Sequence, residues 1–231
     1  MKKKIVYVGL AADLIHHGHL NIINKASELG YVIVGLLTDE AIASYKRLPL
    51  IPFPERMTII SNIKGVDEVC AQKTLDYVPN LRRIKPDYVV HGNDWKTGVQ
   101  KETRQRVLDT LREWDGELIE PEYTKGISST LLNNAIKSKG ITPAIRLRSL
   151  KRLIGAKPLL TFMETHNGLS GLVVEKTIVR KHHKKKEFDG FWLSSLTLST
   201  AKGKPDTELV DFSSRFSVVE EILEVSTKPM I

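Results

Sequence analysis

His16 and His19 lie close together near the N-terminus, in the run His16-His17-Gly18-His19. His16 and His19 are three residues apart, so both can lie on one side of a first helical turn. A helix start also offers unpaired backbone N–H groups and a partial positive charge, and Gly18 allows a ligand to approach the backbone closely. Together these groups are suited to bind the phosphates of a nucleotide.

The context of this motif is a strand-to-helix turn. The apolar run 5–8 precedes it, and the amphipathic segment 20–30 follows it and ends at Gly30. A single histidine is more often a surface or core residue, and a related tetrapeptide occurs in class I aminoacyl-tRNA synthetases. The position after a predicted strand and before a predicted helix favours a functional role over chance.

Up to about residue 137, apolar strand-like runs alternate with amphipathic helical segments. We expect strands at 5–8, 32–37, 68–70, 88–90 and 117–119, and helices at 20–30, 55–63, 77–84 and 102–114. This alternation predicts an α/β domain, in which a parallel sheet carries helices on both faces. Ligands bind such sheets beyond the carboxyl ends of the strands, where the histidine motif falls.

The pattern changes after residue 137. We expect one domain at 1–137, a linker with a basic helix at 138–156, and a second domain at 157–231 that opens with a strand at 159–163. The apolar runs 172–174 and 188–192 are strand-like. The basic run 180–186 between them contains no aromatic residue and predicts a solvated hairpin tip rather than a nucleic-acid surface.

Composition narrows the class of protein. The chain has 231 residues, a net charge of +8 and one cysteine, Cys70, which favours a reducing compartment. No apolar stretch reaches the roughly 18 residues of a membrane span. The N-terminal apolar run is interrupted by Asp13 and fits a strand better than a signal peptide. We therefore expect a cytoplasmic homo-oligomer with small anionic substrates and no membrane or nucleic-acid partner.

Further motifs follow the histidines in order. They are Thr38-Asp39-Glu40 after the second strand, Pro54-Glu55-Arg56 at a helix start, Gly92-Asn93-Asp94-Trp95 after a strand, and Gly126-Ile127-Ser128-Ser129-Thr130. With the histidine run 16–19 these make five motifs, which extend over nearly all of residues 1–137. They resemble the HxGH nucleotidyltransferases, and most closely the glycerol-3-phosphate and choline-phosphate cytidylyltransferases. The resemblance implies a Rossmann-like nucleotidyltransferase sheet.

The resemblance also implies roles for individual residues. Catalytic roles fall on His16, His19, Lys46 and Arg56, and nucleotide-binding roles on Leu10, Ala11, Asp13, Gly18, Asp39, Gly92, Asp94, Trp95, Gly126, Ile127, Ser128, Ser129 and Thr130. An acceptor oxygen would attack the α-phosphorus of CTP, with Mg²⁺ on the triphosphate, and pyrophosphate would leave. No residue is assigned as a protein metal ligand.

Each of these later motifs also has an ordinary structural interpretation. Ser128–Thr130 fits a helix N-cap, Arg56 a solvated helix charge and Trp95 a core residue. Lys46, in a loop, fits a surface lysine and a phosphate-binding cation equally.

Two segments depart from the family pattern. The chain has Leu10-Ala11-Ala12-Asp13 where the family usually has Gly-Thr-Phe-Asp, and Tyr123-Thr124-Lys125-Gly126 where it usually has Arg-Thr-Glu-Gly. The second change removes a phosphate-binding cation, which Lys125 can partly replace. Both changes bear on the acceptor more than on CTP, so neither glycerol 3-phosphate nor phosphocholine is assumed.

The second domain resembles the opening of phosphoenolpyruvate mutase, a (β/α)₈ barrel of the isocitrate lyase superfamily. The similar segments are 162–171, 191–196 and 201–206. The resemblance implies that Trp192, Ser194 and Leu196 line the substrate pocket and that Asp206 takes part in the phosphoryl step. The Asp-Gly-Asp-Thr-Gly segment of that family does not occur before Ile231. We therefore expect an incomplete barrel fragment of a longer bifunctional protein, without mutase activity in residues 1–231.

The two resemblances together predict a phosphonate pathway. The expected reaction is cytidylyl transfer from CTP to a phosphonate such as 2-hydroxyethylphosphonate, or to a phosphate. Two alternatives stay open: an adenylyltransferase of the same superfamily, and a non-catalytic nucleotide-binding or nucleic-acid-binding module.

Overall fold

The computed structural model describes residues 3–96, 100–122, 132, 141–181 and 184–231. The chain divides into two compact units, residues 1–133 and 134–231. Each unit has its own sheet and its own hydrophobic core, and they are described separately.

The first unit is built on a five-stranded parallel sheet. The strands are β1 (Ile5–Leu10), β2 (Tyr31–Leu37), β3 (Glu68–Gln72), β4 (Tyr88–Val90) and β5 (Glu117–Ile119), in the order β3-β2-β1-β4-β5. The predicted parallel α/β sheet is confirmed. The order of the strands changes direction at β1, and this places the loop after β1 at the switch point where ligands bind in such folds.

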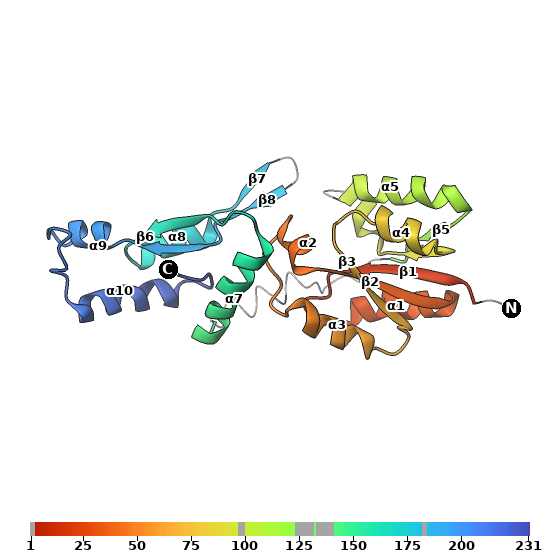
Figure 1. The fold of residues 1–231 in the computed structure, drawn as a ribbon, viewed down its shortest axis with the longest axis horizontal. Helices are drawn as coiled ribbons and strands as arrows, with labels where there is room; N and C mark the ends of the chain where they lie inside the picture. Colours follow the sequence, from red (N-terminus) through yellow and green to blue (C-terminus); the bar gives the residue numbers. More distant parts are fainter. Residues whose placement is uncertain (1–2, 97–99, 123–131, 133–140, 182–183) are drawn as a thin grey trace. The chain divides into compact units, whose positions relative to one another are not determined.

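Helices cover both faces of this sheet (Figure 1). They are α1 (His17–Leu29), α2 (Asp39–Ala43), α3 (Phe53–Ser61), α4 (Val78–Ile84) and α5 (Lys101–Leu111), with 3₁₀ turns at Asn93–Lys96 and Arg112–Trp114. The side chains of α1 and α3 pack on one face, and those of α4 and α5 on the other. The short helix α2, which begins after the Thr38 cap, is not among the predicted elements.

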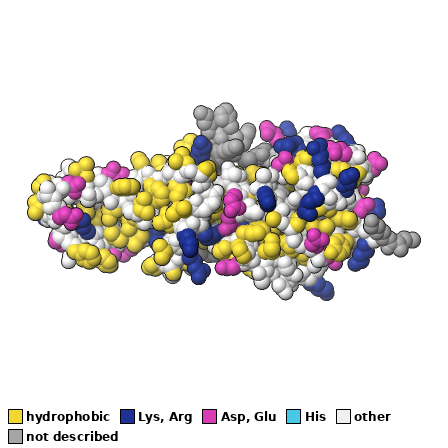
Figure 2. All heavy atoms as spheres, viewed as in Figure 1, with side chains coloured by type: hydrophobic (Ala, Val, Ile, Leu, Met, Phe, Trp, Pro, Cys, Tyr) yellow, Lys and Arg dark blue, Asp and Glu magenta, His cyan; other side chains and the backbone are white. Residues whose placement is uncertain are grey.

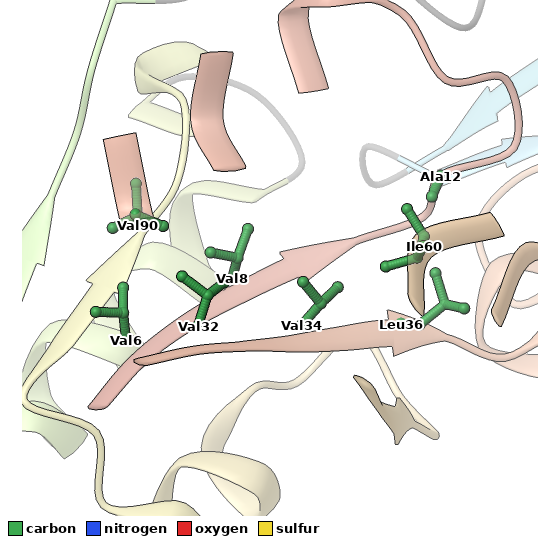
Figure 3. Packing of buried hydrophobic residues seen from close by; sticks show 9 residues of the cluster. Val6, Val8, Ala12, Val32, Val34, Leu36, Ile60 and Val90 are labelled. Atoms are coloured by element: carbon green, nitrogen blue, oxygen red, sulfur yellow. The ribbon is translucent and has the colours of Figure 1, made fainter. Parts of the chain in front are cut away.

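The α1–α3 face of the sheet carries the larger core cluster. Val6 and Val8 of β1 pack with Val32, Val34 and Leu36 of β2, and Ile60 of α3 closes the cluster, as Figure 3 shows. All of these side chains have 0% exposure. Burying a side chain of this size contributes roughly 1.5–3 kcal/mol, so this cluster fixes the strands whose carboxyl ends carry the site.

Close backbone packing requires glycine at two places in the first unit. A Cβ atom on Gly9 would lie 2.3 Å from the Tyr77 ring, which packs directly on the end of β1. A Cβ on Gly30 would lie 2.1 Å from the carbonyl oxygen of Lys4, and this contact ends α1 at the predicted residue. Only glycine fits where another group approaches the backbone this closely.

The second unit begins with a helix and continues with alternating strands and helices. Its elements are α7 (Pro143–Ala156), β6 (Phe162–Thr165), α8 (Gly168–Lys176), β7 (Val179–Lys181), β8 (Lys184–Lys186), β9 (Gly190–Leu193), α9 (Ser195–Ala201) and α10 (Phe212–Glu224). Strands β6 and β9 are parallel, and Phe191 forms a further parallel bridge to Met230. The apolar side chains of α8, α9 and α10 pack around Phe191.

Three predictions for this unit are corrected. The apolar run 172–174 is not a strand, because it lies inside α8, where Asn167 caps the helix by accepting a 2.8 Å bond from the Ser170 N–H. The basic run itself supplies both strands of the antiparallel hairpin β7–β8, instead of only its tip. The opening strand is 162–165, not 159–163.

A buried arginine ties α7 to the end of α10. Arg146 is 8% exposed, and its guanidinium donates to the carbonyl oxygens of Leu223, Ser226 and Lys228. The Leu223 carbonyl belongs to the last turn of α10, where a helix leaves its C=O groups without partners, and the other two carbonyls follow the helix. Helix α7 is therefore an integral part of the second unit.

The surfaces of the two units differ in character. Side chains of both charges alternate over α4 and α5, whereas the second unit exposes many apolar side chains (Figure 2). Among the latter, Leu159, Leu169 and Phe212 are each more than 70% exposed. Within the described residues, no helix is both long and apolar enough to span a bilayer.

Candidate active site

The two motif histidines face each other at the start of α1. His16 is the N-cap residue with an extended backbone, and its N–H lies 3.4 Å from Nδ1 of His19. The two ring centroids are 4.0 Å apart. The predicted placement of both rings on one side of the first helical turn is therefore observed.

Both imidazoles are neutral near pH 7. Burial, together with smaller effects of the charges of His16 and Lys46, lowers the pKa of His19 to about 4. Burial, with a smaller effect of His17, also lowers the pKa of His16. Because Nδ1 of His19 accepts a hydrogen bond, its proton lies on Nε2, which is left as a donor.

One polar atom of this pair has no partner. Nδ1 of His16 is buried, and no group among the described residues forms a close hydrogen bond with it, although the His16 side chain faces the backbone N–H of His19 in a capping-box arrangement. A buried polar atom without a partner costs free energy, commonly about 1–3 kcal/mol, and such atoms call for an explanation. A ligand oxygen at the helix N-terminus would satisfy it, as the sequence analysis expects for a phosphate.

Lys46 belongs to the same electrostatic neighbourhood. It lies in the loop after α2, where its N–H donates to the carbonyl of Ile42 at 3.0 Å. Burial lowers the pKa of its ammonium group, Asp13 raises it and Arg56 lowers it. Its charge in turn acts on His19. Lys46 is thus a half-buried cation whose charge influences the pKa of His19.

Asp13 joins the loop after β1 to the loop that carries Lys46. Its side chain is 5% exposed, and Oδ1 accepts a 3.1 Å bond from the backbone N–H of Ile51. The preceding residue, Ala12, has a φ of +51°, which is uncommon for a residue other than glycine. Asp13 therefore positions the loops and influences the charge of Lys46.

Arg56 differs from its expected role. The guanidinium is fully buried, and it donates to the carbonyls of Ala11 (2.5 Å), Leu37 (2.8 Å) and Ile51 (3.0 Å) and to Oδ1 of Asp39 (2.8 Å). Four of its five N–H donors are thus occupied by protein acceptors. In this arrangement Arg56 holds the ends of β1 and β2 together, and the expected direct contact with a triphosphate is not what its geometry favours.

The motif after β4 forms a closed polar network. Trp95 is 1% exposed, and its Nε1 donates to Glu120 at 2.8 Å. Arg104 donates to both oxygens of Glu120 at 2.8 Å, and Nζ of Lys96 lies 3.3 Å from it. These donors lower the pKa of Glu120 to about 2, with the Arg104 hydrogen bond as the largest cause.

Sequence reasoning missed His91, which stacks on Trp95 with ring centroids 3.9 Å apart and planes at 12°. Burial lowers the pKa of His91, and its Nδ1 lies 2.8 Å from the carbonyl of Gly92. Tyr77 contacts the same pair, with its ring centroid 5.8 Å from that of Trp95. The position of His91, directly after a buried strand, was the available signal.

The remaining predicted residues are placed as follows. Leu10 ends β1, Gly18 lies in the first turn of α1, and Gly92 and Asp94 lie in the turn after β4. The segment 126–130, with Gly126, Ile127, Ser128, Ser129 and Thr130, lies outside the described residues. So do the expected departures at 123–125.

The described carboxylates do not gather into a metal site. No group of three histidine, cysteine or acidic side chains able to hold an ion exists within the described ranges. Asp39 is engaged by Arg56, and Asp13 by the Ile51 N–H.

In the second unit, the expected pocket residues lie around the start of α9. Trp192 in β9 is 54% exposed and Leu196 is 59% exposed. Ser194 caps α9 by accepting a 3.3 Å bond from the Thr197 N–H. The hydroxyl of Ser195 donates to Asp206 at 3.4 Å, which brings this carboxylate to the same end of the helix.

Two protein-family models match the chain. Residues 7–135 match the cytidylyltransferase-like family, and residues 150–231 match phosphoenolpyruvate phosphomutase. Together they agree with the expected order of the two domains.

Individual relatives match the first unit. Ethanolamine-phosphate cytidylyltransferase of Mus musculus is 36% identical over 121 residues, which are 51% of this chain and 29% of that protein. The protein of the same name from Arabidopsis thaliana is 37% identical over 95 residues, 38% of this chain and 23% of that protein. The match thus spans about a quarter of the length of these relatives.

A shorter relative matches almost completely. Glycerol-3-phosphate cytidylyltransferase of Bacillus spizizenii is 32% identical over 140 residues, 60% of this chain and 99% of that protein. Among solved structures, a lipopolysaccharide core biosynthesis protein of Thermoplasma volcanium aligns with 54% of this chain and 99% of its own, at 19% identity and a TM-score of 0.45. With its family match over residues 7–135, this chain belongs to the cytidylyltransferase-like family.

Proposed function

We propose that the first unit transfers the cytidylyl group of CTP to a phosphonate or phosphate acceptor. In this reaction an acceptor oxygen forms a bond to the α-phosphorus, and the bond from that phosphorus to the β-phosphate oxygen breaks. The electron pair leaves with pyrophosphate. The acceptor oxygen is already anionic near neutral pH, so the site must position the reactants and stabilise negative charge rather than remove a proton.

The observation that carries this proposal is the neutral histidine pair beside Lys46. His16 and His19 lie at a helix N-terminus, with one buried nitrogen left without a partner. Neutral imidazoles donate hydrogen bonds to phosphate oxygens without repelling the nearby ammonium group. Lys46 adds the positive charge that the developing pyrophosphate needs.

Arg56 and Asp13 position these donors. Arg56 fixes the carbonyls of Ala11 and Leu37, which end the two central strands, and Asp13 fixes the loop of Lys46 through Ile51. Mg²⁺ bound to the triphosphate would neutralise part of its charge, and we assign no protein ligand to it.

The acceptor class is inferred from the second unit. A family model of phosphoenolpyruvate phosphomutase matches residues 150–231. The resemblance to that family implies the transfer of a phosphoryl group from oxygen to carbon, which forms a phosphonate. A fused cytidylyltransferase could then activate a phosphonate formed downstream of this step. We therefore propose a phosphonate such as 2-hydroxyethylphosphonate ahead of phosphoethanolamine or glycerol 3-phosphate, the acceptors that the names of the relatives suggest.

The test is pyrophosphate release by the full chain with CTP and Mg²⁺. The panel contains 2-hydroxyethylphosphonate, 2-aminoethylphosphonate, phosphoethanolamine, phosphocholine and glycerol 3-phosphate, with ATP replacing CTP in a parallel series. We expect turnover with CTP and a phosphonate, and we expect His16→Ala to reduce this turnover strongly. Preference for a phosphate ester would overturn the acceptor assignment, preference for ATP would overturn the choice of base, and absence of CTP binding would overturn the whole proposal.

A further inference from the structure

A groove outside the histidine site lies between the end of β3 and α4. Its volume is about 340 Å³, and its walls include Gln72, Lys73, Thr74, Asp76, Asn80 and Arg83. Strand β3 is an edge strand of the sheet. The groove adjoins the carboxyl end of β2, because the N–H of Thr38 donates to the carbonyl of Gln72 at 3.0 Å.

The inner wall of the groove is held by a chain of hydrogen bonds. Asn80 Nδ2 donates to the hydroxyl of Tyr7 (2.9 Å) and to the carbonyl of Ala71 (3.1 Å). The Tyr7 hydroxyl donates to Oε1 of Gln72 at 2.7 Å, and Nε2 of Gln72 donates to the carbonyl of Thr74 at 3.1 Å. A ligand would therefore meet a preformed wall, whose ordering costs nothing further on binding.

The charge of the groove is positive. Lys73 and Arg83 line it, and neither forms an ion pair within the described part of the chain. The one carboxylate in the wall, Asp76, already accepts bonds from Arg106 at 2.7 Å and from the N–H of Val78 at 3.2 Å. The two cations thus outnumber the single carboxylate of the wall, which is already paired with Arg106, and this arrangement attracts a small anion.

We propose that this groove binds a small organic anion of the carboxylate or phosphonate class through Arg83 and Lys73. The planar guanidinium of Arg83 matches the two oxygens of such a group, and Lys73 adds a second point of charge. The anion has two possible sources: the far end of an acceptor that carries a second anionic group, or a separate effector molecule. The proposal does not rest on the proposed reaction.

The single cysteine of the chain reports on this groove. Cys70 is half-buried, and its Sγ lies 3.9 Å from Nδ2 of Asn80. Burial raises the pKa of the Cys70 thiol, while the charge and hydrogen bond of Arg83 lower it. An anion paired with Arg83 would cancel part of that charge, and this reduces the fraction of reactive thiolate.

The experiment measures the rate at which iodoacetamide alkylates Cys70 in the full chain at constant pH and ionic strength. Malonate and phosphonoacetate are titrated against chloride. We expect a saturable slowing with the two organic anions and none with chloride. Because the chain has one cysteine, the whole signal comes from this site.

Two arginines on the same helix give a matched pair of variants. Arg83→Gln should lose the saturable slowing, measured against its own rate without anion. Arg82→Gln should keep it, because Arg82 is paired with Glu113 at 2.6 Å and does not line the groove. Thermal melts of both variants confirm that they are folded. Slowing that follows ionic strength alone, or that survives in Arg83→Gln, overturns the proposal.

A second arm separates the two sources of the anion. If malonate competes with the acceptor in pyrophosphate release, the groove holds part of the acceptor. If it changes the turnover rate or the KM of CTP without competing with the acceptor, the groove holds a separate effector. Alkylation needs no turnover, so a failure of the proposed reaction leaves the test of the groove intact.

Discussion

The loop after β1 and the turn after β4 both lie at the carboxyl edge of one parallel sheet, and both carry motifs that the sequence marks as nucleotide-binding. Their polar groups are satisfied very differently. In the first region, Nδ1 of His16 has no partner within the described residues, and burial lowers the pKa of His19 and of Lys46. In the second, three donors converge on Glu120 and lower its pKa to about 2.

This difference separates ligand-binding groups from the frame that holds them. A buried donor without a partner makes a favourable contribution to ligand binding when the ligand supplies that partner. A hydrogen-bond network that is already complete contributes little to binding. We therefore expect changes in the first region to alter activity, and changes in complete networks to alter stability. Arg56 is the sharpest case, since it lies beside the histidine site but has four of its five N–H donors bonded to protein atoms.

The largest effect is expected for Arg56→Met. It leaves the carbonyls of Ala11 and Leu37 and the carboxylate of Asp39 without their buried donor, so the free energy of unfolding should fall by about 3–5 kcal/mol. Urea denaturation of the full chain measures this. If the urea midpoint were unchanged and only the affinity for CTP fell, Arg56 would be a ligand-binding residue and the comparison would fail.

His16→Ala should show the opposite behaviour. It removes a phosphate donor but no completed hydrogen bond of its side chain, so we expect pyrophosphate release to fall by about 10²–10³-fold while the urea midpoint hardly moves. A control is His17→Ala, which changes the exposed neighbour. Equal losses in both variants would show that the motif acts only through helix stability.

Glu120→Gln tests the closed network. The amide keeps an acceptor for Trp95 but loses the charge that Arg104 and Lys96 bind, so the free energy of unfolding should fall by about 1–3 kcal/mol at pH 7. Since folding lowers the pKa of Glu120, its stabilisation is present above pH 4.5 and is lost as the pH falls towards 2. The difference in the free energy of unfolding between the wild type and Glu120→Gln should therefore vanish as the pH falls from 4.5 towards 2.

The smallest effect concerns the charge of His19. Its pKa falls from 6.5 to about 4 on folding, so the folded state favours the neutral ring. The neutral ring therefore makes its full contribution to the free energy of unfolding above pH 6.5, and this contribution is lost as the pH falls towards 4. Urea midpoints of the wild type should drop over this range more steeply than those of His19→Asn. Parallel curves would show that the ring titrates as an exposed histidine.

The sequence predicted the sheet of the first unit well because buried parallel strands are continuous apolar runs. It predicted the pairing of His16 and His19 because side chains three residues apart in a helix lie on the same side. It could not predict the role of Arg56, since a sequence does not show that four acceptors from separate segments meet at one guanidinium. The run 172–174 was misassigned because a short apolar run fits a strand and a buried helix equally.

The bonds of Arg146 decide where the second unit can be cut from the chain. The matched family segment begins at residue 150, but the guanidinium that binds the carbonyls of Leu223, Ser226 and Lys228 lies four residues earlier. A piece excised at the family boundary would lose this side chain and most of the first two turns of α7. Excision before Thr142, which caps α7, would preserve both.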